Sequence, residues 1–258
     1  MNHSFIDKYA ENESPVHRLD PRTKLGLSLL LVVAVVLTRA DAWWAYSAYL
    51  LTIVALFFVA GVPLTYVLKR TLIILPFVAM AGFFVPFIPG GETAVSLDIW
   101  WWSITVSGEG LEIFRNLMAR AGISVLAMIL LTSTTRFSEL MAALDKLKAP
   151  RIVVLLMSFM YRYLFIITDE IMRMRQARDS RNFGGSRLWQ AKTVGHMIGT
   201  LFIRSFERGE RVYDAMTARG LNGNARIVYK HRFGWPDMIT ASVISALSVI
   251  LVAAGAWL

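Results

Sequence analysis

The sequence predicts an all-α polytopic membrane protein with about five transmembrane helices and long amphipathic helices on the cytoplasmic side. Of its 258 residues, 56% are hydrophobic, which exceeds the apolar fraction of an ordinary soluble domain. Several apolar runs are long enough to cross about 30 Å of hydrocarbon as helices. The basic residues are concentrated in one region, because residues 134–235 hold 18 of the 27 Lys and Arg.

Five apolar runs are predicted to span the membrane, and they cover residues 22–40, 42–60, 70–89, 110–133 and 236–258. The first two are separated by a short turn, so they are expected to form a helical hairpin. Four prolines, at positions 63, 76, 86 and 89, are expected to break or kink the region of the third run. The Trp-rich stretch at residues 100–102 is expected at a membrane interface, where Trp is enriched.

The distribution of charge predicts the orientation, because Lys and Arg mark cytoplasmic loops. Arg18, Arg22 and Lys24 lie before or at the very start of the first span, whereas Glu92, Asp98 and Glu109 are the charges between residues 90 and 110. The amino terminus is therefore predicted to lie in the cytoplasm, with the protein in the inner membrane. No signal-peptide pattern precedes the first apolar run, which is expected to remain as an anchor.

Three parts of the chain follow from this topology. Residues 1–133 are predicted to form a membrane domain with four spans. Residues 134–235 are predicted to form a cytoplasmic and membrane-surface region, and residues 236–258 a final transmembrane helix. The basic charge of the middle part is typical of cytoplasmic loops, so nucleic acid is not expected as a partner.

Residues 152–167 form an apolar run with two possible placements. Basic residues flank both ends, and Arg162 interrupts the run, which costs about 2.5–3.5 kcal/mol at the centre of a span. The run is therefore interpreted as a helix along the membrane face or packed under the other spans. A sixth span is the alternative.

Two charged helices are predicted within the basic region, and each ends in an Ala-Arg pair. The first ends in Ala177-Arg178-Asp179 and the second in Ala218-Arg219-Gly220. In the second helix, Phe202, Phe206, Gly209, Tyr213 and Met216 recur at helical spacing and predict an apolar face that packs against the rest of the protein. Arg208, Arg211 and Arg219 share another face, and Arg175 lies one turn before Arg178 in the first helix.

An arginine at a helix end is suited to bind carboxylates, because its planar guanidinium forms paired hydrogen bonds. The simpler alternative is that these arginines cap helix carbonyls and neutralise anionic membrane lipids. The spacing alone leaves both interpretations open.

Other chemistry has little support in the sequence. The chain contains no cysteine, which excludes disulfides and thiolate sites, and no Walker-type loop for ATP. The four histidines lack metal-ligand spacing. Met1-Asn2-His3 is the exception, because an amino terminus with His at position three can chelate Cu(II) or Ni(II). An intramembrane enzyme would need ionisable groups paired at mid-bilayer depth, which the spans lack, and a channel gives no reason for two matched arginine helices.

The motifs resemble those of one transporter family. The paired Ala-Arg tripeptides are similar to the coupling motifs of the transmembrane, or T, component of energy-coupling factor transporters. The stretches most similar to its CbiQ-type cobalt branch are residues 6–10, residues 14–25, Asp169-Glu170-Ile171-Met172 and residues 215–220. Asp179 departs from the family pattern, which usually has a small residue there.

The resemblance implies a non-catalytic subunit of an ATP-driven importer. Two ABC-type ATPase subunits would bind ATP and Mg, while this chain would bind no cofactor. Arg178 and Arg219 would each enter a groove of one ATPase subunit, with Ala177, Asp179, Ala218 and Gly220 shaping the helix ends. A separate membrane subunit would bind the substrate, for which the resemblance favours cobalt over nickel or a vitamin. A conventional ABC importer permease is the remaining alternative, although no Glu-Ala-Ala coupling element is found.

Overall fold

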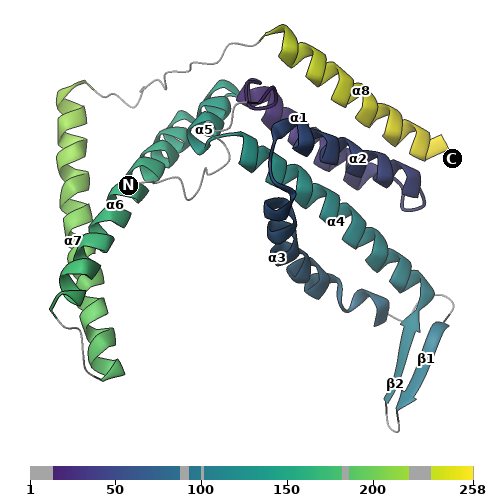
Figure 1. Ribbon diagram of the computed structural model, residues 1–258, viewed down its shortest axis with the longest axis horizontal. Helices are drawn as coiled ribbons and strands as arrows, with labels where there is room; N and C mark the ends of the chain where they lie inside the picture. The colour runs from purple at the N-terminus through teal and green to yellow at the C-terminus, as the bar shows by residue number, and fades with distance from the viewer. Residues whose placement is uncertain (1–13, 88–92, 100–101, 182–185, 221–233, 258) are drawn as a thin grey trace. The chain divides into compact units, whose positions relative to one another are not determined.

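The computed structural model describes residues 14–87, 93–99, 102–181, 186–220 and 234–257, and it divides into two compact units (Figure 1). The bundle unit comprises Ser4–Arg136 and Lys230–Leu258. The long-helix unit contains Phe137–Tyr229. Each unit has its own internal packing, and the two are described separately below.

The described residues of the bundle unit form five long helices: α1 (Pro21–Leu37), α2 (Trp43–Ala60), α3 (Leu64–Gly82), α4 (Gly108–Thr134) and α8 (Trp235–Trp257). Helix α4 is central, because it packs against α1, α2 and α3, while α8 packs against α1 and α2. A short 3-10 helix, η1 (Val85–Phe87), follows α3. The helical class predicted from the sequence is confirmed.

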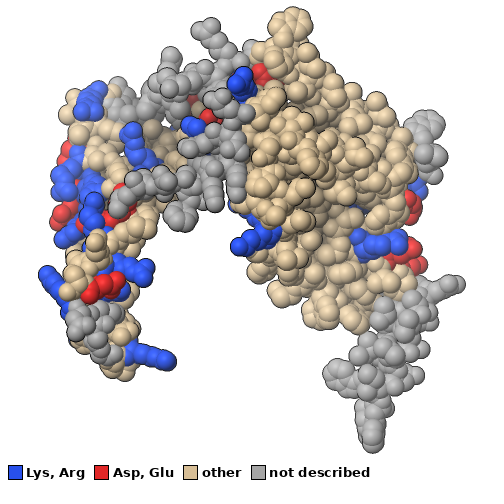
Figure 2. Space-filling model, viewed as in Figure 1, with Lys and Arg blue, Asp and Glu red and all other residues tan. Residues whose placement is uncertain are grey.

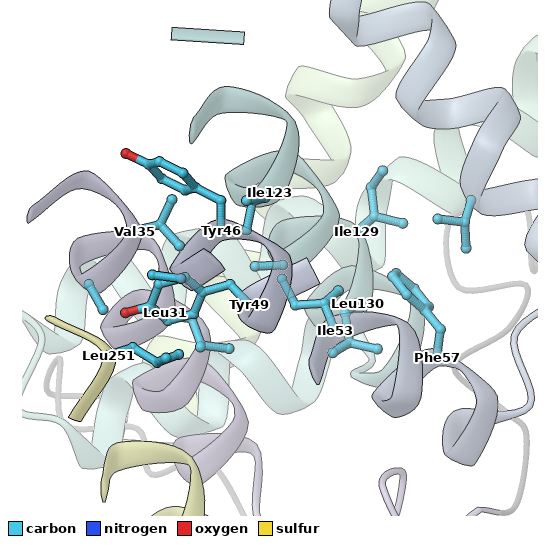
Figure 3. Close-up of a cluster of buried hydrophobic side chains, with 14 of the residues drawn as sticks. Leu31, Val35, Tyr46, Tyr49, Ile53, Phe57, Ile123, Ile129, Leu130 and Leu251 are labelled. Atoms are coloured by element: carbon cyan, nitrogen blue, oxygen red, sulfur yellow. The ribbon is translucent and has the colours of Figure 1, made fainter. Parts of the chain in front are cut away.

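The core of the bundle follows from helical periodicity. Tyr49, Ile53 and Phe57 recur every four residues along α2, which places them on one face, and all three are at most 1% exposed. They meet Val35 of α1 and Ile123 of α4 in one cluster of buried side chains (Figure 3). Many apolar side chains on the other faces remain exposed, as expected of helices whose outer surface contacts lipid.

Five helices of the described residues are long and apolar enough to cross a membrane: α2, α3 with η1, α4, α6 (Arg151–Asp179) and α8. The predicted span at residues 22–40 is a helix, α1, but it has 17 residues and therefore a length of about 25 Å. Helix α6 contains the run at 152–167, so the sixth-span alternative has a helix of sufficient length.

Two details differ from the predicted elements. Helix α3 begins at Leu64 rather than near residue 70 and continues through Pro76. Residues near the predicted Trp-rich interface form an antiparallel hairpin of β1 (Thr93–Ile99) and β2 (Trp102–Ser107), with Ser96 opposite Thr105. The alternation of polar and apolar residues through Val95, Leu97 and Ile99 was the available signal for a strand. Trp100 and Trp101 lie outside the described residues.

The close approach of η1 to the start of α4 requires a glycine. A Cβ at Gly110 would lie 2.7 Å from the Val85 carbonyl oxygen and 2.9 Å from Pro86 Cα. Ser107 caps the same helix end by accepting a hydrogen bond from the Gly110 N–H at 3.4 Å. These contacts fix where the hairpin ends and α4 begins.

A buried polar network joins α1 and α8. Asp237 Oδ1 accepts hydrogen bonds from the Asp20 N–H at 2.7 Å and the Thr23 hydroxyl at 3.1 Å. Its Oδ2 accepts from the Gly234 N–H at 2.9 Å. Asp237 is 4% exposed, so these partners compensate the cost of removing its carboxylate from water.

Lys24 extends this network to the end of α4. Its Nζ donates to the Thr134 carbonyl at 2.9 Å and to the His17 carbonyl at 2.8 Å. Cations are favourable at a helix carboxyl terminus, where the last carbonyls lack intrahelical partners. Lys24 therefore holds the last turn of α4 close to the first turn of α1.

Three helices build the long-helix unit: α5 (Phe137–Lys146), α6 and α7 (Arg187–Ala218). Helix α5 packs on α6, where the rings of Phe137 and Tyr161 stack with centroids 4.7 Å apart. Helix α6 is continuous, so the apolar run at 152–167 and the first charged helix of the sequence form one element of 29 residues. Helix α7 then runs back across α6 (Figure 1).

Candidate functional site

The carboxyl end of α6 holds the first arginine signature in an internally bonded arrangement. The Arg178 guanidinium donates through Nε at 2.9 Å and through Nη2 at 2.7 Å to Asp179 Oδ1. Ser180 donates its hydroxyl to the Ala177 carbonyl at 3.0 Å, which partly satisfies the helix terminus. Arg175 Nε lies 3.8 Å from Asp179 Oδ2. The neighbouring carboxylate thus engages both arginines of this helix end.

The carboxyl end of α7 holds the second signature without a comparable acid. Arg219 is exposed, and its N–H donates to the Met216 carbonyl at 3.0 Å. Gly220 has a φ of 80°, the left-handed conformation that ends many helices and that glycine adopts without a Cβ penalty. Among the described residues, no carboxylate pairs with the Arg219 guanidinium. Ala218 is the last helical residue, and its small side chain leaves the arginine accessible.

The carboxylate of Glu170 links α6 to α7 at a point between the two arginine-bearing helix ends. Glu170 of α6 pairs with Arg204 Nη1 of α7 at 2.6 Å and with Arg173 Nη2 at 2.9 Å. Only 15% of the Glu170 side chain is exposed. The pairing between Glu170 and Arg204 could not be read from the sequence, because the two residues are 34 positions apart and carry no shared spacing.

The two signatures lie at opposite ends of this helix pair. From the Glu170–Arg204 contact, α6 continues for nine residues to Asp179, and α7 continues for 14 residues to Ala218 in the opposite direction (Figure 1). At 1.5 Å per residue, the two helix ends are on the order of 30 Å apart. The two arginines therefore lie at separate positions and do not form one composite site.

An apolar groove of about 260 Å³ lies between α6 and α7. It is lined from α6 by Phe159, Tyr163 and Ile167, and from α7 by Gly209 and Met216. The packing of this pair is therefore incomplete, in contrast to the core of the bundle unit.

Two expectations about the faces of α7 need correction. Gly209, Tyr213 and Met216 line the groove toward α6, whereas Phe202 and Phe206, predicted on the same apolar face, are 70% and 60% exposed within this unit. Arg208 was placed on an outward face with Arg211, but it lines the groove toward α6. The helix crossing selects a face centred on Arg204, Arg208 and Val212, and sequence periodicity alone does not reveal which face a crossing helix covers.

The remaining charges of the long-helix unit lie near its surface. Arg211 is exposed, with its Nη1 3.8 Å from Glu207 Oε2, a separation at which an ion pair contributes little. Blue and red side chains are spread over α6 and α7, whereas the visible face of the bundle unit is mostly tan (Figure 2). Exposed ionic groups such as Arg211 thus lie on the surface of this unit.

Among the residues that the structure describes, no three or more His, Cys, Asp or Glu side chains lie together in a way that could hold a metal ion. The candidate chelating segment Met1-Asn2-His3 lies outside those residues.

Comparison with known proteins assigns the chain to a family. A family model described as CbiQ, cobalt transport protein, matches residues 12–229. The energy-coupling factor transporter transmembrane protein EcfT of Brevibacillus brevis is 29% identical, covering 96% of each chain, and that of Bacillus subtilis is 27% identical, also covering 96% of each. An uncharacterized protein of Methanocaldococcus jannaschii is 27% identical over 95% of this chain and 86% of its own length. The chain therefore belongs to the CbiQ family, the transmembrane components of energy-coupling factor transporters.

Proposed function

We propose that this chain transmits ATP-driven motion from two ABC-type ATPase subunits to a separate substrate-binding membrane subunit. The observation that carries the proposal is the pair of arginine-bearing helix ends, Arg178 on α6 and Arg219 on α7, at opposite ends of one helix pair. Two contact points on the order of 30 Å apart suit two ATPase subunits, each of which receives one helix end.

The chemistry of the contact follows from the guanidinium group. Arg178 and Arg219 each present a planar fork of donors that pairs with a carboxylate more specifically than an ammonium does. Ala177 and Ala218, directly before the arginines, let the helix end approach a groove closely. The membrane part would then move when the ATPase subunits pull the two ends together or apart.

The two ends are tested by co-purification with the ATPase subunits in mild detergent. Arg178→Glu and Arg219→Glu are each expected to lower ATPase recovery, and the double variant is expected to abolish it. Lys192→Glu is the matched control, because Lys192 is an exposed cation of α7 outside both signatures. Unchanged recovery in the correctly inserted double variant would contradict the docking role and return these arginines to lipid binding or helix capping.

Cobalt is proposed as the substrate, because the matching family model is described as a cobalt transport protein. Nickel or a vitamin is the alternative, since the relatives named above carry no substrate in their names. Uptake of radioactive cobalt by cells that express the whole transporter tests this proposal. Cobalt uptake that excess nickel leaves unchanged would support it, whereas cells that accumulate nickel or a vitamin but no cobalt would refute it.

The orientation of the chain can be tested with single cysteines, because the chain has none of its own. We propose a cytoplasmic amino terminus and a cytoplasmic long-helix unit. Cysteines at Lys148 and Ser180, which flank α6, are then both protected from an impermeant thiol reagent in intact cells. Labelling of only one of them would show that α6 crosses the membrane and would favour the sixth-span alternative.

A further inference from the structure

A second feature of the bundle unit is independent of the coupling signatures. Helices α2, α3 and α4 enclose an open apolar cleft of about 800 Å³. Trp43 and Leu50 line it from α2, Leu75 from α3, and Gly122 and Leu126 from α4. A cleft of this size falls within the range of small-molecule sites, but it opens between helices that span the membrane, so the bilayer is its immediate surroundings.

Arg115 lies at one end of this cleft. The Arg115 guanidinium carbon lies 4.5 Å from the centroid of the Trp43 ring, in a cation–π contact. Arg115 shares a face of α4 with the cleft residues Met118, Gly122 and Leu126, which follow it at intervals of three or four residues. The cleft therefore combines an apolar body with one positively charged end.

The other arginines near this end already have partners. Arg120 donates to the Thr38 carbonyl at 2.8 Å and to the Tyr46 hydroxyl at 2.9 Å, and thereby caps the end of α1. Arg39 lies 3.9 Å from Asp41. Among the side chains that the structure describes, no carboxylate forms an ion pair with Arg115, so this cation is available to an external anion.

The position of the charged end matches a membrane interface. Trp43 is the first residue of α2, and Arg115 lies in the second turn of α4. Tryptophan is enriched at the level of lipid headgroups, and arginine near the end of a span extends toward phosphates. An anion at headgroup depth with apolar chains attached to it is the defining chemistry of a phospholipid.

We propose that this cleft binds one anionic phospholipid, with its phosphate on Arg115 and its acyl chains along Leu50, Leu75 and Leu126. A transmembrane helix of a partner subunit is the alternative occupant. Arg115 favours the lipid, because a phosphate lies at the headgroup depth of Trp43 and Arg115, whereas a partner helix would have to supply an anion of its own there.

Native mass spectrometry of the full chain in mild detergent tests the proposal with two lipids, phosphatidylglycerol and phosphatidylcholine of equal chain length. The wild type is expected to retain phosphatidylglycerol preferentially. Arg115→Gln is expected to bind phosphatidylglycerol about fivefold more weakly, since one interfacial cation contributes about 1 kcal/mol. Phosphatidylcholine binding should weaken less, because its choline cation offsets the charge of the phosphate. Arg39→Gln is the control. Arg39 lies in the turn before Trp43, but its guanidinium is 3.9 Å from the Asp41 carboxylate.

The apolar body of the cleft is tested with Gly122→Leu. A Cβ at Gly122 meets no atom within 4 Å, so the larger side chain enters the open cleft without displacing the fold. This variant is expected to lose both lipids while its thermal unfolding midpoint stays within a few degrees of the wild type. Gly195→Leu, at an equally open glycine of α7, is the control and should retain them.

Two outcomes would overturn the proposal. Equal retention of phosphatidylglycerol by the wild type and Arg115→Gln would remove the headgroup site. Unchanged lipid binding by Gly122→Leu, together with loss of a membrane subunit from the purified complex, would assign the cleft to a protein partner.

Discussion

The two units of this protein use their polar groups in opposite ways. In the bundle unit, Asp237 and Lys24 are almost fully buried and are bonded to backbone and hydroxyl groups of neighbouring helices. In the long-helix unit, ionic side chains such as Arg211 and Asp179 are exposed. Each lies 3.8 Å from an oppositely charged group one turn away on the same helix. Buried networks specify one internal arrangement, whereas exposed pairs add little stability and remain available to other molecules.

The difference indicates which unit depends on outside contacts. Residues of the bundle core such as Tyr49 and Ile53 are fully buried, while Val154 is the one residue of α6 that is buried and α7 has none. A helix pair with so little internal packing gains little from its own contacts. Its ordering is expected to increase when partner subunits or lipid cover it.

Replacement of Asp237 should produce the largest effect on stability. Asp237→Ala leaves three donors without their acceptor, on Asp20, Thr23 and Gly234. The expected loss is about 3 kcal/mol of unfolding free energy, measured by denaturation in detergent. Ser242→Ala, at an exposed hydroxyl of the same helix, should change it by less than about 0.5 kcal/mol. Equal losses in the two variants would contradict the distinction between buried and exposed polar groups.

The two arginine signatures should differ in their contribution to ATPase binding. Arg219→Ala is expected to weaken the affinity for an ATPase subunit on the order of a hundredfold, since it removes one partner of an interfacial charge pair. Arg178→Ala should have a smaller effect, because Asp179 already holds that guanidinium. The measurement is the dissociation constant of each complex in detergent, and a larger effect of Arg178→Ala would reverse the ranking.

Removal of Asp179 should make the contribution of Arg178 to ATPase affinity more similar to that of Arg219. Asp179→Ser takes away the carboxylate that accepts two hydrogen bonds from Arg178. The ATPase affinity is expected to rise up to about fivefold, the scale of an exposed ion pair of about 1 kcal/mol. A weaker complex would show instead that Asp179 itself contacts the partner. Asp214→Ser, an exposed acid of α7 outside the signatures, serves as the control.

The ion pairs of Glu170 should give the smallest effect. Glu170→Gln removes one charge from contacts with Arg204 and Arg173, which are 55% and 66% exposed. The unfolding free energy is expected to fall by less than about 1 kcal/mol. Hydrogen exchange should increase in α6 and α7 and stay unchanged in the bundle. Glu210→Gln, at an exposed acid of α7, is the comparison, and an equal increase in hydrogen exchange there would argue against a specific role of the crossing.

Hydrophobic length and charge predicted much of this protein. The apolar runs at 42–60, 110–133 and 236–258 correspond to α2, α4 and α8. A transmembrane helix needs about 20 consecutive apolar residues, and other elements of a protein seldom contain so long an apolar run. Both arginine signatures lie at helix ends, as the following glycines and the end of the helical periodicity predicted.

Tertiary contacts account for what the sequence did not predict. The start of α3 at Leu64 follows from Pro63, which favours the first turn of a helix as well as its interruption. Phe202 is exposed and Arg208 lines the groove, because the crossing with α6 determines which face of α7 is covered within this unit. The networks of Lys24 and Asp237 join residues more than 100 positions apart, and no local pattern encodes such pairs.

The positions of Thr134 and Asp237 have a mechanical consequence. The chain passes between the two units at Arg136–Phe137 and at Tyr229–Lys230. Thr134, two residues before the first passage, is bonded to Lys24, and Asp237, seven residues after the second, is bonded to Asp20 and Thr23. The first turn of α1 and its cap are therefore bonded to residues close to both places where the chain leaves the bundle unit, and we expect a pull on either connection to reach the bundle first at this turn.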